Sequence, residues 1–342
     1  MTEQYISQRR PFVFSHGVKV VSSASAGGTK EKNGPVGHLL DIHCPDESLS
    51  GDSWEKAESQ MVKDTFSCAL QKAQITEKSI DILFGGDLMN QCTGTSYGLC
   101  GFDVPYIGLY GACSTFIQGV MCASAMIESG LVKTAAVCVS SHFATAERQY
   151  RFPLEYGAFP GPSAQNTVTG CGCVILKKAD PDEKGIFVKA ALPGIVIDRG
   201  IKDAANMGAA MATAAADTTL RYLEASGKKV TDFDIIATGD LGAVGHDMEL
   251  DMLKQHGVRD ERGIFKDCGT LIYDVSSQDV GVGGSGCGCS AVVTSSLFFD
   301  LMNKGKIRNA AVIGTGAMMS PQSLLQGLSI PSVAHLTEFE VH

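Results

Sequence analysis

The sequence predicts an α/β protein of two similar halves, because one arrangement of strands and helices occurs twice along the chain. Residues 80–88 form a short apolar segment of strand length that ends in Gly-Asp-Leu, and residues 233–241 repeat this segment and its ending. An amphipathic helical pattern precedes each copy, over about 54–72 and about 211–225. The length of 342 residues accommodates two packed halves, which we place at about 1–180 and 181–342.

A second matched pair of segments follows these strands. Residues 111–114, Gly-Ala-Cys-Ser, precede a helical pattern that extends to Gly130 and then a strand over 135–140. In the other half, residues 286–290, Gly-Cys-Gly-Cys-Ser, precede a helical pattern to about Asn303 and a strand over 310–316. A further strand closes each half, over 169–176 and 332–339. This alternation of strands with helices predicts a mostly parallel sheet that helices cover on both faces.

The repeated segments also predict where a ligand binds. Ligands of parallel α/β sheets bind beyond the carboxyl ends of the strands. The Gly-Asp-Leu segments and the Gly-Ala-Cys-Ser segment all lie at such ends, so they point to one place. We expect the two helices that follow these elbows to pack the halves together, with their N-termini meeting at one pocket.

Composition and charge exclude several classes of function. The formal net charge is −9 and no run rich in Lys or Arg occurs, so the chain lacks the basic face that nucleic acid requires. No apolar run approaches the roughly 18 residues of a membrane span, and the first ten residues do not resemble a signal peptide. We therefore expect a soluble chain made in the cytoplasm.

The twelve cysteines predict free thiols rather than disulfides or metal ligands. No Cys-x-x-Cys pair occurs, and several cysteines lie within apolar segments, as small buried residues do. Cys171 and Cys173 share one face of a strand, but the apolar residues that follow them favour packing over metal binding. We expect no metal site and no cofactor.

The duplication and the segment around Cys113 resemble the thiolase superfamily, which includes the condensing enzymes of fatty-acid synthesis. Residues 104–110, Val-Pro-Tyr-Ile-Gly-Leu-Tyr, form a predicted strand that leads into Cys113 at a strand–turn–helix elbow, as in that superfamily. The resemblance implies a duplicated thiolase-like fold, layered αβαβα. It also implies a homodimer that forms through the edge strand near residues 104–110.

Several longer segments resemble one family within that superfamily, which serves sporulation in spore-forming bacteria. These segments are residues 30–38, 85–91, 140–149, 214–218, 238–241 and 283–291. The resemblance implies a protein that binds dipicolinate (pyridine-2,6-dicarboxylate), alone or as its calcium chelate, for uptake into developing spores. It also implies peripheral association with the inner spore membrane through integral sporulation membrane proteins.

Cys113 is the residue with the clearest chemical potential. A thiol in the first turn of a helix meets free backbone N–H groups and the positive end of the helix dipole, which favour the thiolate. A condensing enzyme prepares its nucleophile in this way. A small residue that fills a tight elbow would occupy the same position, so Cys113 is either a nucleophile, now vestigial, or a packing residue.

The partners that a condensing enzyme needs are missing from the matching positions. Catalysis requires His together with His or Asn, which hold the acyl oxyanion and transfer protons. The second-half strand end holds Gly239 and Asp240 where relatives have a His, and the nearest imidazole, that of His246, falls in a predicted loop. The second elbow, at residues 286–290, contains neither His nor Asn. We therefore predict that the protein is not an enzyme.

The same positions still suit an anion. Helix N-termini at the two elbows, which contain Cys113 and Ser114 in one half and Cys289 and Ser290 in the other, can bind a carboxylate through backbone N–H groups. Asp87 and Asp240 occupy equivalent strand ends and either contact the ligand, with or without calcium, or cap the following turns.

Three further residues follow a strand end of the first half. His142 is either a ligand contact or a structural histidine, and Arg148 and Arg151 either bind a carboxylate or form a surface salt bridge. The predicted ligand-binding residues are Asp87, Cys113, Ser114, His142, Arg148, Asp240, Cys289 and Ser290.

Three functions are consistent with this sequence. The first is a non-catalytic thiolase-fold protein that binds dipicolinate. The second is an active acyltransferase or condensing enzyme that uses Cys113 with His142 or His246. The third is a structural scaffold of a spore membrane complex.

Overall fold

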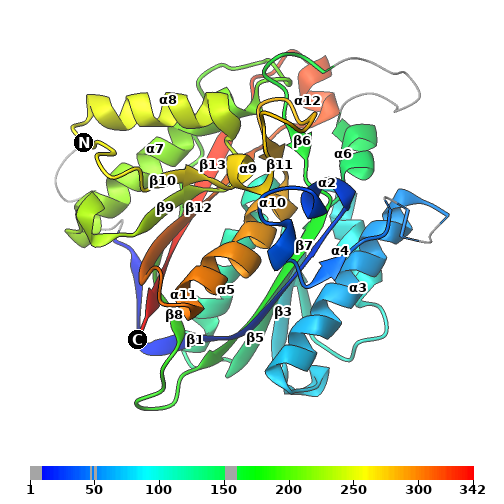
Figure 1. The fold of residues 1–342 in the computed structure, drawn as a ribbon, viewed down its shortest axis with the longest axis vertical. Coiled ribbons are helices and arrows are strands. Elements are labelled where there is room, and N and C mark those ends of the chain that lie inside the picture. Colours follow the sequence, from blue (N-terminus) through cyan, green and yellow to red (C-terminus); the bar gives the residue numbers. More distant parts are fainter. Residues whose placement is uncertain (1–9, 47, 50–51, 151–159) are drawn as a thin grey trace.

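One mixed sheet runs through the computed structural model, which describes residues 10–46, 48–49, 52–150 and 160–342 (Figure 1). Its strands occur in the order β10-β9-β12-β13-β8-β1-β7-β5-β3-β4, and β2 pairs with β1. In chain order these strands are β1 (Phe12–Gly27), β2 (Ile42–His43), β3 (Ile82–Gly86), β4 (Tyr106–Gly108), β5 (Thr134–Ser141), β7 (Gly170–Lys178), β8 (Ile186–Leu192), β9 (Ile235–Thr238), β10 (Phe265–Asp267), β12 (Asn309–Ala317) and β13 (Ser332–Val341). The short strands β6 (Asn166–Thr167) and β11 (Gly284–Ser285) form a separate pair.

The strand order is the same in the two parts of the sheet when each is followed from its outer edge to the centre. The series β4-β3-β5-β7-β1 corresponds to the series β10-β9-β12-β13-β8. The innermost strands β1 and β8 pair antiparallel, for example at Val18 and Val188, and so join the two series. These two strands have no counterpart in the repeated pattern that we recognised in the sequence.

The expectation of a mostly parallel sheet is wrong for its centre. β3 runs parallel to β4 and β5, and β9 runs parallel to β10 and β12. β7 and β13, however, run antiparallel to β5 and β12, because each begins beside the end of the strand that precedes it. Gly170 lies opposite Ser141, and Ser332 lies opposite Ala317. A strand that returns from the same end of a sheet must run in the opposite direction.

Helices form the remaining layers of the molecule. α5 (Thr115–Glu128) packs against strands of both series, β3 and β5 on one side and β12 and β13 on the other. Figure 1 shows α5, α10 (Cys287–Val293) and α11 (Phe299–Asn303) in the middle, α3 (Trp54–Ala73) and α4 (Thr93–Leu99) on one outer side, and α7 (Met207–Ser226) and α8 (Gly242–Gln255) on the other. This arrangement is the layered α/β fold that the sequence predicts.

The central helix of the second half is continuous but not regular. α10 leads into a π-helical turn, Thr294–Phe298, and then into α11, so the helical pattern ends at Asn303 as predicted. Every residue of α10 is buried, which agrees with its place between layers. Within the described residues, we find no helix that combines the length and the apolar character needed to cross a membrane.

Short helices surround the carboxyl ends of the strands, where the candidate site lies. They are α2 (Thr29–Lys32), α6 (Phe143–Tyr150), α9 (Cys268–Ile272) and α12 (Pro321–Leu325). α6 follows β5 and α12 follows β12, so the two helices hold corresponding places in the two strand series. The predicted strand over 104–110 is regular only at Tyr106–Gly108, where β4 forms one edge of the sheet.

Candidate functional site

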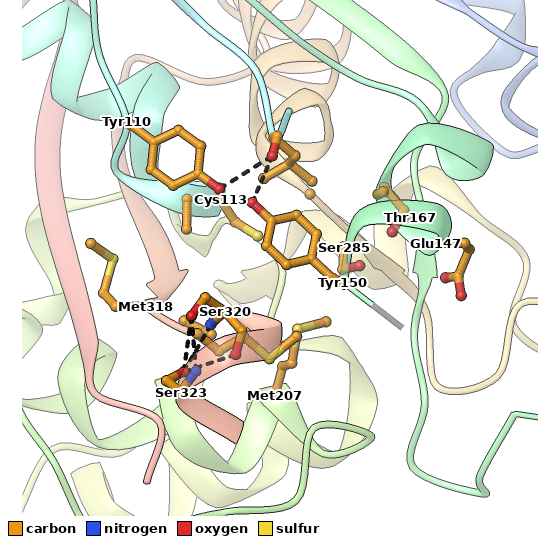
Figure 2. Close-up of a pocket in the computed structure, with 16 residues that line it drawn as sticks. Tyr110, Cys113, Glu147, Tyr150, Thr167, Met207, Ser285, Met318, Ser320 and Ser323 are labelled. Atoms are coloured by element: carbon orange, nitrogen blue, oxygen red, sulfur yellow. Dashed lines mark hydrogen bonds between the residues drawn. The ribbon is translucent and has the colours of Figure 1, made fainter. Parts of the chain in front are cut away.

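A cavity of about 280 Å³ lies where the two elbows of the sequence meet. Cys113 and Gly286 both line this cavity, which confirms the expectation that the elbows share one pocket. In Figure 2, Tyr110 and Tyr150 lie on the side of Cys113, and residues of the second half face them. The described lining residues are Leu88, Tyr110, Ala112, Cys113, Ala146, Glu147, Tyr150, Thr167, Met207, Ser285, Gly286, Ala317, Met318, Met319, Ser320 and Ser323. None of these described residues is a histidine, a lysine or an arginine.

Hydrogen bonds within the turn hold the elbow that presents Cys113. Ala112 has a φ of 50°, which residues with a side chain rarely adopt. The hydroxyl of Ser114 donates to the carbonyl oxygen of Gly111 at 2.7 Å, and the hydroxyl of Thr115 donates to that of Ala112 at 2.6 Å. Ser114, a predicted ligand-binding residue, is fully buried in this turn and does not line the cavity.

A carboxyl group lies against the thiol of Cys113. The Cys113 thiol lies beside the carboxyl group of Asp240, which accepts hydrogen bonds from the Thr315 hydroxyl at 2.6 Å and from the Gly286 N–H at 3.0 Å. Asp240 is fully buried, and this burial raises its pKa to about 8. Burial and the neighbouring Asp240 raise the pKa of the Cys113 thiol well above its usual value. The cavity therefore presents a protonated thiol rather than a thiolate.

Asp87, which the repeat pairs with Asp240, has a different environment. Its carboxylate accepts hydrogen bonds from the Thr95 N–H and hydroxyl, both at 2.7 Å, and from the Met89 N–H at 3.0 Å. These bonds hold the loop after β3 against the first residues of α4. Asp87 is fully buried and does not line the cavity.

A second buried carboxyl group, that of Glu58 in α3, supports the wall of the cavity. It accepts hydrogen bonds from the hydroxyls of Ser140 at 2.9 Å and Thr145 at 2.8 Å, so it connects α3 to the end of β5 and to α6. Burial and the nearby Asp87 raise the pKa of Glu58 to about 8. Sequence reasoning did not identify this residue, because a single Glu within an amphipathic helical pattern resembles a solvent-exposed position.

The two histidines considered as partners of Cys113 do not line the cavity. His142 is fully buried, and its Nδ1 accepts a hydrogen bond from the Ala144 N–H at 3.1 Å. The prediction that His246 lies in a loop is wrong, because it belongs to α8. Its Nδ1 lies 3.6 Å from Oε2 of the fully buried Glu249.

The remaining predicted ligand-binding residues also lie outside the cavity lining. Arg148 places its guanidinium 2.8 Å from the carboxylate of Glu55 and stacks on the ring of Trp54 at 4.9 Å. Arg151 lies outside the described residues. Cys289 and Ser290 are fully buried in α10.

The cysteines that the sequence offers as potential metal ligands are mostly buried. All twelve cysteines are free thiols, and Cys171 lies in the core with its sulfur 3.6 Å from that of Cys138. Across the described ranges, no group of three or more His, Cys, Asp or Glu side chains is arranged to hold a metal ion.

Of the ligand-binding residues predicted from the sequence, only Cys113 lines the cavity. Tyr110 and Tyr150 contribute aromatic rings, and Met207, Met318 and Met319 contribute flexible apolar side chains. Ser320 is the N-cap of α12 and Ser323 lies within this helix, and the Ser320 hydroxyl accepts a hydrogen bond from the Ser323 N–H. The sequence carries no local signal for these two serines, because their place at the cavity depends on where α12 folds.

Solved structures with the same fold include thiolase-like enzymes. A structure of OleA from Xanthomonas campestris matches with a TM-score of 0.60 at 14% identity, covering 96% of this chain and 99% of that chain. A structure of 3-oxoacyl-[acyl-carrier-protein] synthase III from Aquifex aeolicus VF5 matches with a TM-score of 0.57 at 11% identity, covering 95% of this chain and 100% of that chain. At these identities the likeness establishes a thiolase-like fold alone.

Sequence relatives are much more similar. Stage V sporulation protein AD of Bacillus subtilis (strain 168) is 41% identical over 335 residues, which cover 98% of each chain. The model of the family described as stage V sporulation protein AD matches residues 8–340. The chain, a sporulation protein with a thiolase-like fold, therefore belongs to the stage V sporulation protein AD family.

Proposed function

We propose that this protein binds dipicolinate, free or as its calcium chelate, in the cavity beside Cys113 and performs no chemistry on it. The observation that carries this proposal is the pairing of Cys113 with Asp240. Burial holds the pKa of the Cys113 thiol well above its usual value, so little of the thiolate, which is the nucleophilic form, is present at neutral pH. The elbow therefore keeps its shape and its cavity but not an activated nucleophile.

The lining suits a flat aromatic ligand with polar ends. Tyr110 and Tyr150 present rings that can stack on a pyridine ring, and the neighbouring methionines adapt to its outline. The hydroxyls of Thr167, Ser285 and Ser320 can donate to carboxylate oxygens. The likeness to sporulation proteins supports dipicolinate as the ligand and its uptake into developing spores as the process.

The lining also favours the calcium chelate over the free dianion. Because no described lining residue is a lysine or an arginine, a ligand with two negative charges would find no cationic partner among them. The chelate of one calcium ion with one dipicolinate has no net charge. We expect the chelate to bind more tightly.

Calorimetric titration tests the proposal. Dipicolinate with and without calcium should each give saturable heat with about one site per chain, and pyridine-3,5-dicarboxylate, which cannot chelate in the same way, should bind more weakly. Ser323→Trp should fill the cavity and abolish the heat, whereas Gln322→Trp, at an exposed position of the same helix, should not. No heat with either form of dipicolinate would leave a structural scaffold as the function.

A second candidate function keeps one observation in its favour, the strained elbow that presents Cys113. Ala112 has a positive φ, and Cys113 lines the cavity. An active acyltransferase would release coenzyme A from an acyl-CoA thioester faster than its Cys113→Ala variant. Equal rates for the two proteins are expected, and a faster wild-type rate would contradict binding without catalysis.

We also propose a homodimer that forms through the edge at β4. Ile107 is 44% exposed on this edge strand, and Tyr97 of α4 is 70% exposed. An unpaired edge with apolar side chains is suited to pairing with a second copy. Ile107→Glu should convert a dimer to a monomer in sedimentation velocity experiments, and a wild-type monomer would contradict the proposal.

Membership in a sporulation family supports a role at the inner spore membrane. We infer that integral sporulation membrane proteins recruit the chain, which then associates peripherally. Fractionation of developing spores tests this inference: the protein should sediment with membranes, and a strain without the other membrane proteins of the same system should release it into the soluble fraction.

A further inference from the structure

Asp240 lies directly behind the wall of the cavity. Its carboxyl group accepts a hydrogen bond from the N–H of Gly286 and lies beside the thiol of Cys113, and both of these residues line the cavity. Thr315 and Gly286 occupy its two oxygens with hydrogen bonds of 2.6 Å and 3.0 Å. Asp240 is fully buried, so water does not screen its charge.

The protonation state of Asp240 changes what the ligand meets. An ionised carboxylate only accepts hydrogen bonds, so it draws the Cys113 S–H toward itself and leaves a negative charge behind the cavity wall. A protonated Asp240 is neutral and can itself donate, which frees the Cys113 S–H to point toward the ligand. The second state suits an anionic ligand, and the first repels it.

We propose that Asp240 is the specificity-determining residue of the cavity, which accepts a carboxylate ligand only when Asp240 carries a proton. This inference rests on the proposed function and deepens it, because it states how a cavity without a described basic lining residue tolerates a dicarboxylate. Asp240 acts through Cys113 and is a positioning residue rather than a ligand contact.

The groups around Asp240 favour the protonated state. Burial is the main cause that raises its pKa to about 8, and the nearby carboxyl group of Asp267 in β10 adds to it. Cys113 before α5, Cys268 in α9, and Cys287 and Cys289 in α10 are the other titratable groups that interact with it. Burial raises the pKa of each of these thiols well above its usual value, so they remain neutral near pH 8.

Linkage then fixes the direction of the pH dependence. Because the ligand binds the protonated form, binding at a pH above the pKa of Asp240 takes up a proton from solution. The affinity for free dipicolinate should fall by up to about tenfold for each pH unit above about 8. The calcium chelate, which has no net charge, should show a smaller decrease.

Calorimetry of the full chain with calcium-free dipicolinate tests the inference. The titrations cover about pH 6.5 to about pH 9.5, a range that spans the Asp240 pKa of about 8. Wild type should lose affinity above this pKa. At the alkaline end its binding enthalpy should change with the ionisation enthalpy of the buffer, which measures proton uptake without any substitution. Asp240→Asn keeps a neutral side chain of the same size and should show a nearly constant Kd and no proton uptake. Glu249→Gln, which removes another buried carboxyl group with a raised pKa that does not line the cavity, should keep the wild-type slope.

The outcomes distinguish ligand binding itself from the role of Asp240 in it. No binding by wild type at any pH would overturn the proposed function. Binding by wild type with a constant Kd and no proton uptake, or an Asp240→Asn slope equal to that of wild type, would overturn only the role of Asp240.

Discussion

The hydroxyl groups of Tyr110 and Tyr150 donate hydrogen bonds to one acceptor, the carbonyl oxygen of Leu88, at 3.2 Å and 2.6 Å (Figure 2). The side-chain amide of Gln149 donates to the same oxygen at 2.8 Å. One backbone carbonyl in the loop after β3 therefore fixes both the segment that leads into the Cys113 elbow and the end of α6. The aromatic side of the cavity is held in place by this shared contact.

Removal of one of these hydroxyls should loosen that wall. Tyr150→Phe deletes the donor of the shorter bond, and we expect it to lower the free energy of unfolding by about 1 kcal/mol. Urea denaturation followed by circular dichroism measures the change. Tyr97→Phe, at a position that is 70% exposed, is the matched control and should leave stability unchanged. Equal stabilities for the two variants would show that the shared contact has no structural role.

Much of the fold was predictable because the duplication is visible in the strand and helix patterns. The apolar stripe of α3, with Met61, Val62 and Phe66 buried, is of this kind. The direction of β7 and β13 was not predictable, since apolar runs of strand length carry no information about which end of the sheet they start from. β1 was missed for another reason: its residues 12–27 include Gly17 and several serines, which obscure a strand pattern.

The candidate site was predictable only at its elbows. A position at a strand end is consistent with either a ligand contact or a cap of the following turn, and three-dimensional packing turns Asp87 toward α4, as its bonds to Thr95 show. Asp240 is turned toward the back of Cys113 instead. The actual lining from α12 depends on where that short helix folds over the cavity, which no local pattern specifies.

Gly286 is predicted to be intolerant of any side chain. Its φ is +98°, and a methyl group there would lie 2.7 Å from the Ser141 hydroxyl oxygen. Gly257→Ala, at a φ of +82° with open space around it, should cost about 1 kcal/mol from backbone strain alone. Gly286→Ala should cost about 1–3 kcal/mol more, because of the clash and because its φ of 98° and ψ of 159° lie in a region that only glycine adopts readily, and should also abolish dipicolinate binding. Thermal denaturation compares the two, and equal costs would contradict the contact.

The stability of the protein should decrease as the pH rises, in part because of Glu58. Its pKa is raised from 4.5 to about 8 in the folded protein, so the unfolded chain releases this proton first. The stabilising contribution is complete below about pH 4.5 and is lost as the pH rises through about 8. Glu58→Gln should therefore lose less stability than wild type between these values, measured by urea denaturation.

The control for this prediction is Glu55→Gln on the same helix, where the carboxylate pairs with Arg148 at the surface. This variant should keep the wild-type pH dependence. Part of the decrease should persist in Glu58→Gln, because the pKa of Asp240 is also raised to about 8. A decrease of the same size in Glu58→Gln and wild type would show that Glu58 is not the source.

Cys113 should react slowly with alkylating reagents. Burial and the adjacent Asp240 hold its pKa well above the usual value, so little thiolate exists at neutral pH. Cys100 is exposed and is the internal reference. Iodoacetamide labelling followed by peptide mass spectrometry should show Cys113 reacting at least about tenfold more slowly than Cys100. Preferential labelling of Cys113 would indicate an activated nucleophile and support the enzymatic alternative.

Arg148 provides a test of whether a basic residue outside the cavity lining contributes to binding. Its guanidinium pairs with Glu55 and stacks on Trp54, and neither of these two partners lines the cavity. Because the pair is largely exposed, Arg148→Ala should lower the free energy of unfolding by at most about 1 kcal/mol. Because Arg148 does not line the cavity, the Kd for dipicolinate should change by less than about twofold, which corresponds to about 0.4 kcal/mol. A loss of tenfold or more in calorimetry would instead mean that Arg148 leaves Glu55 to bind the ligand carboxylate.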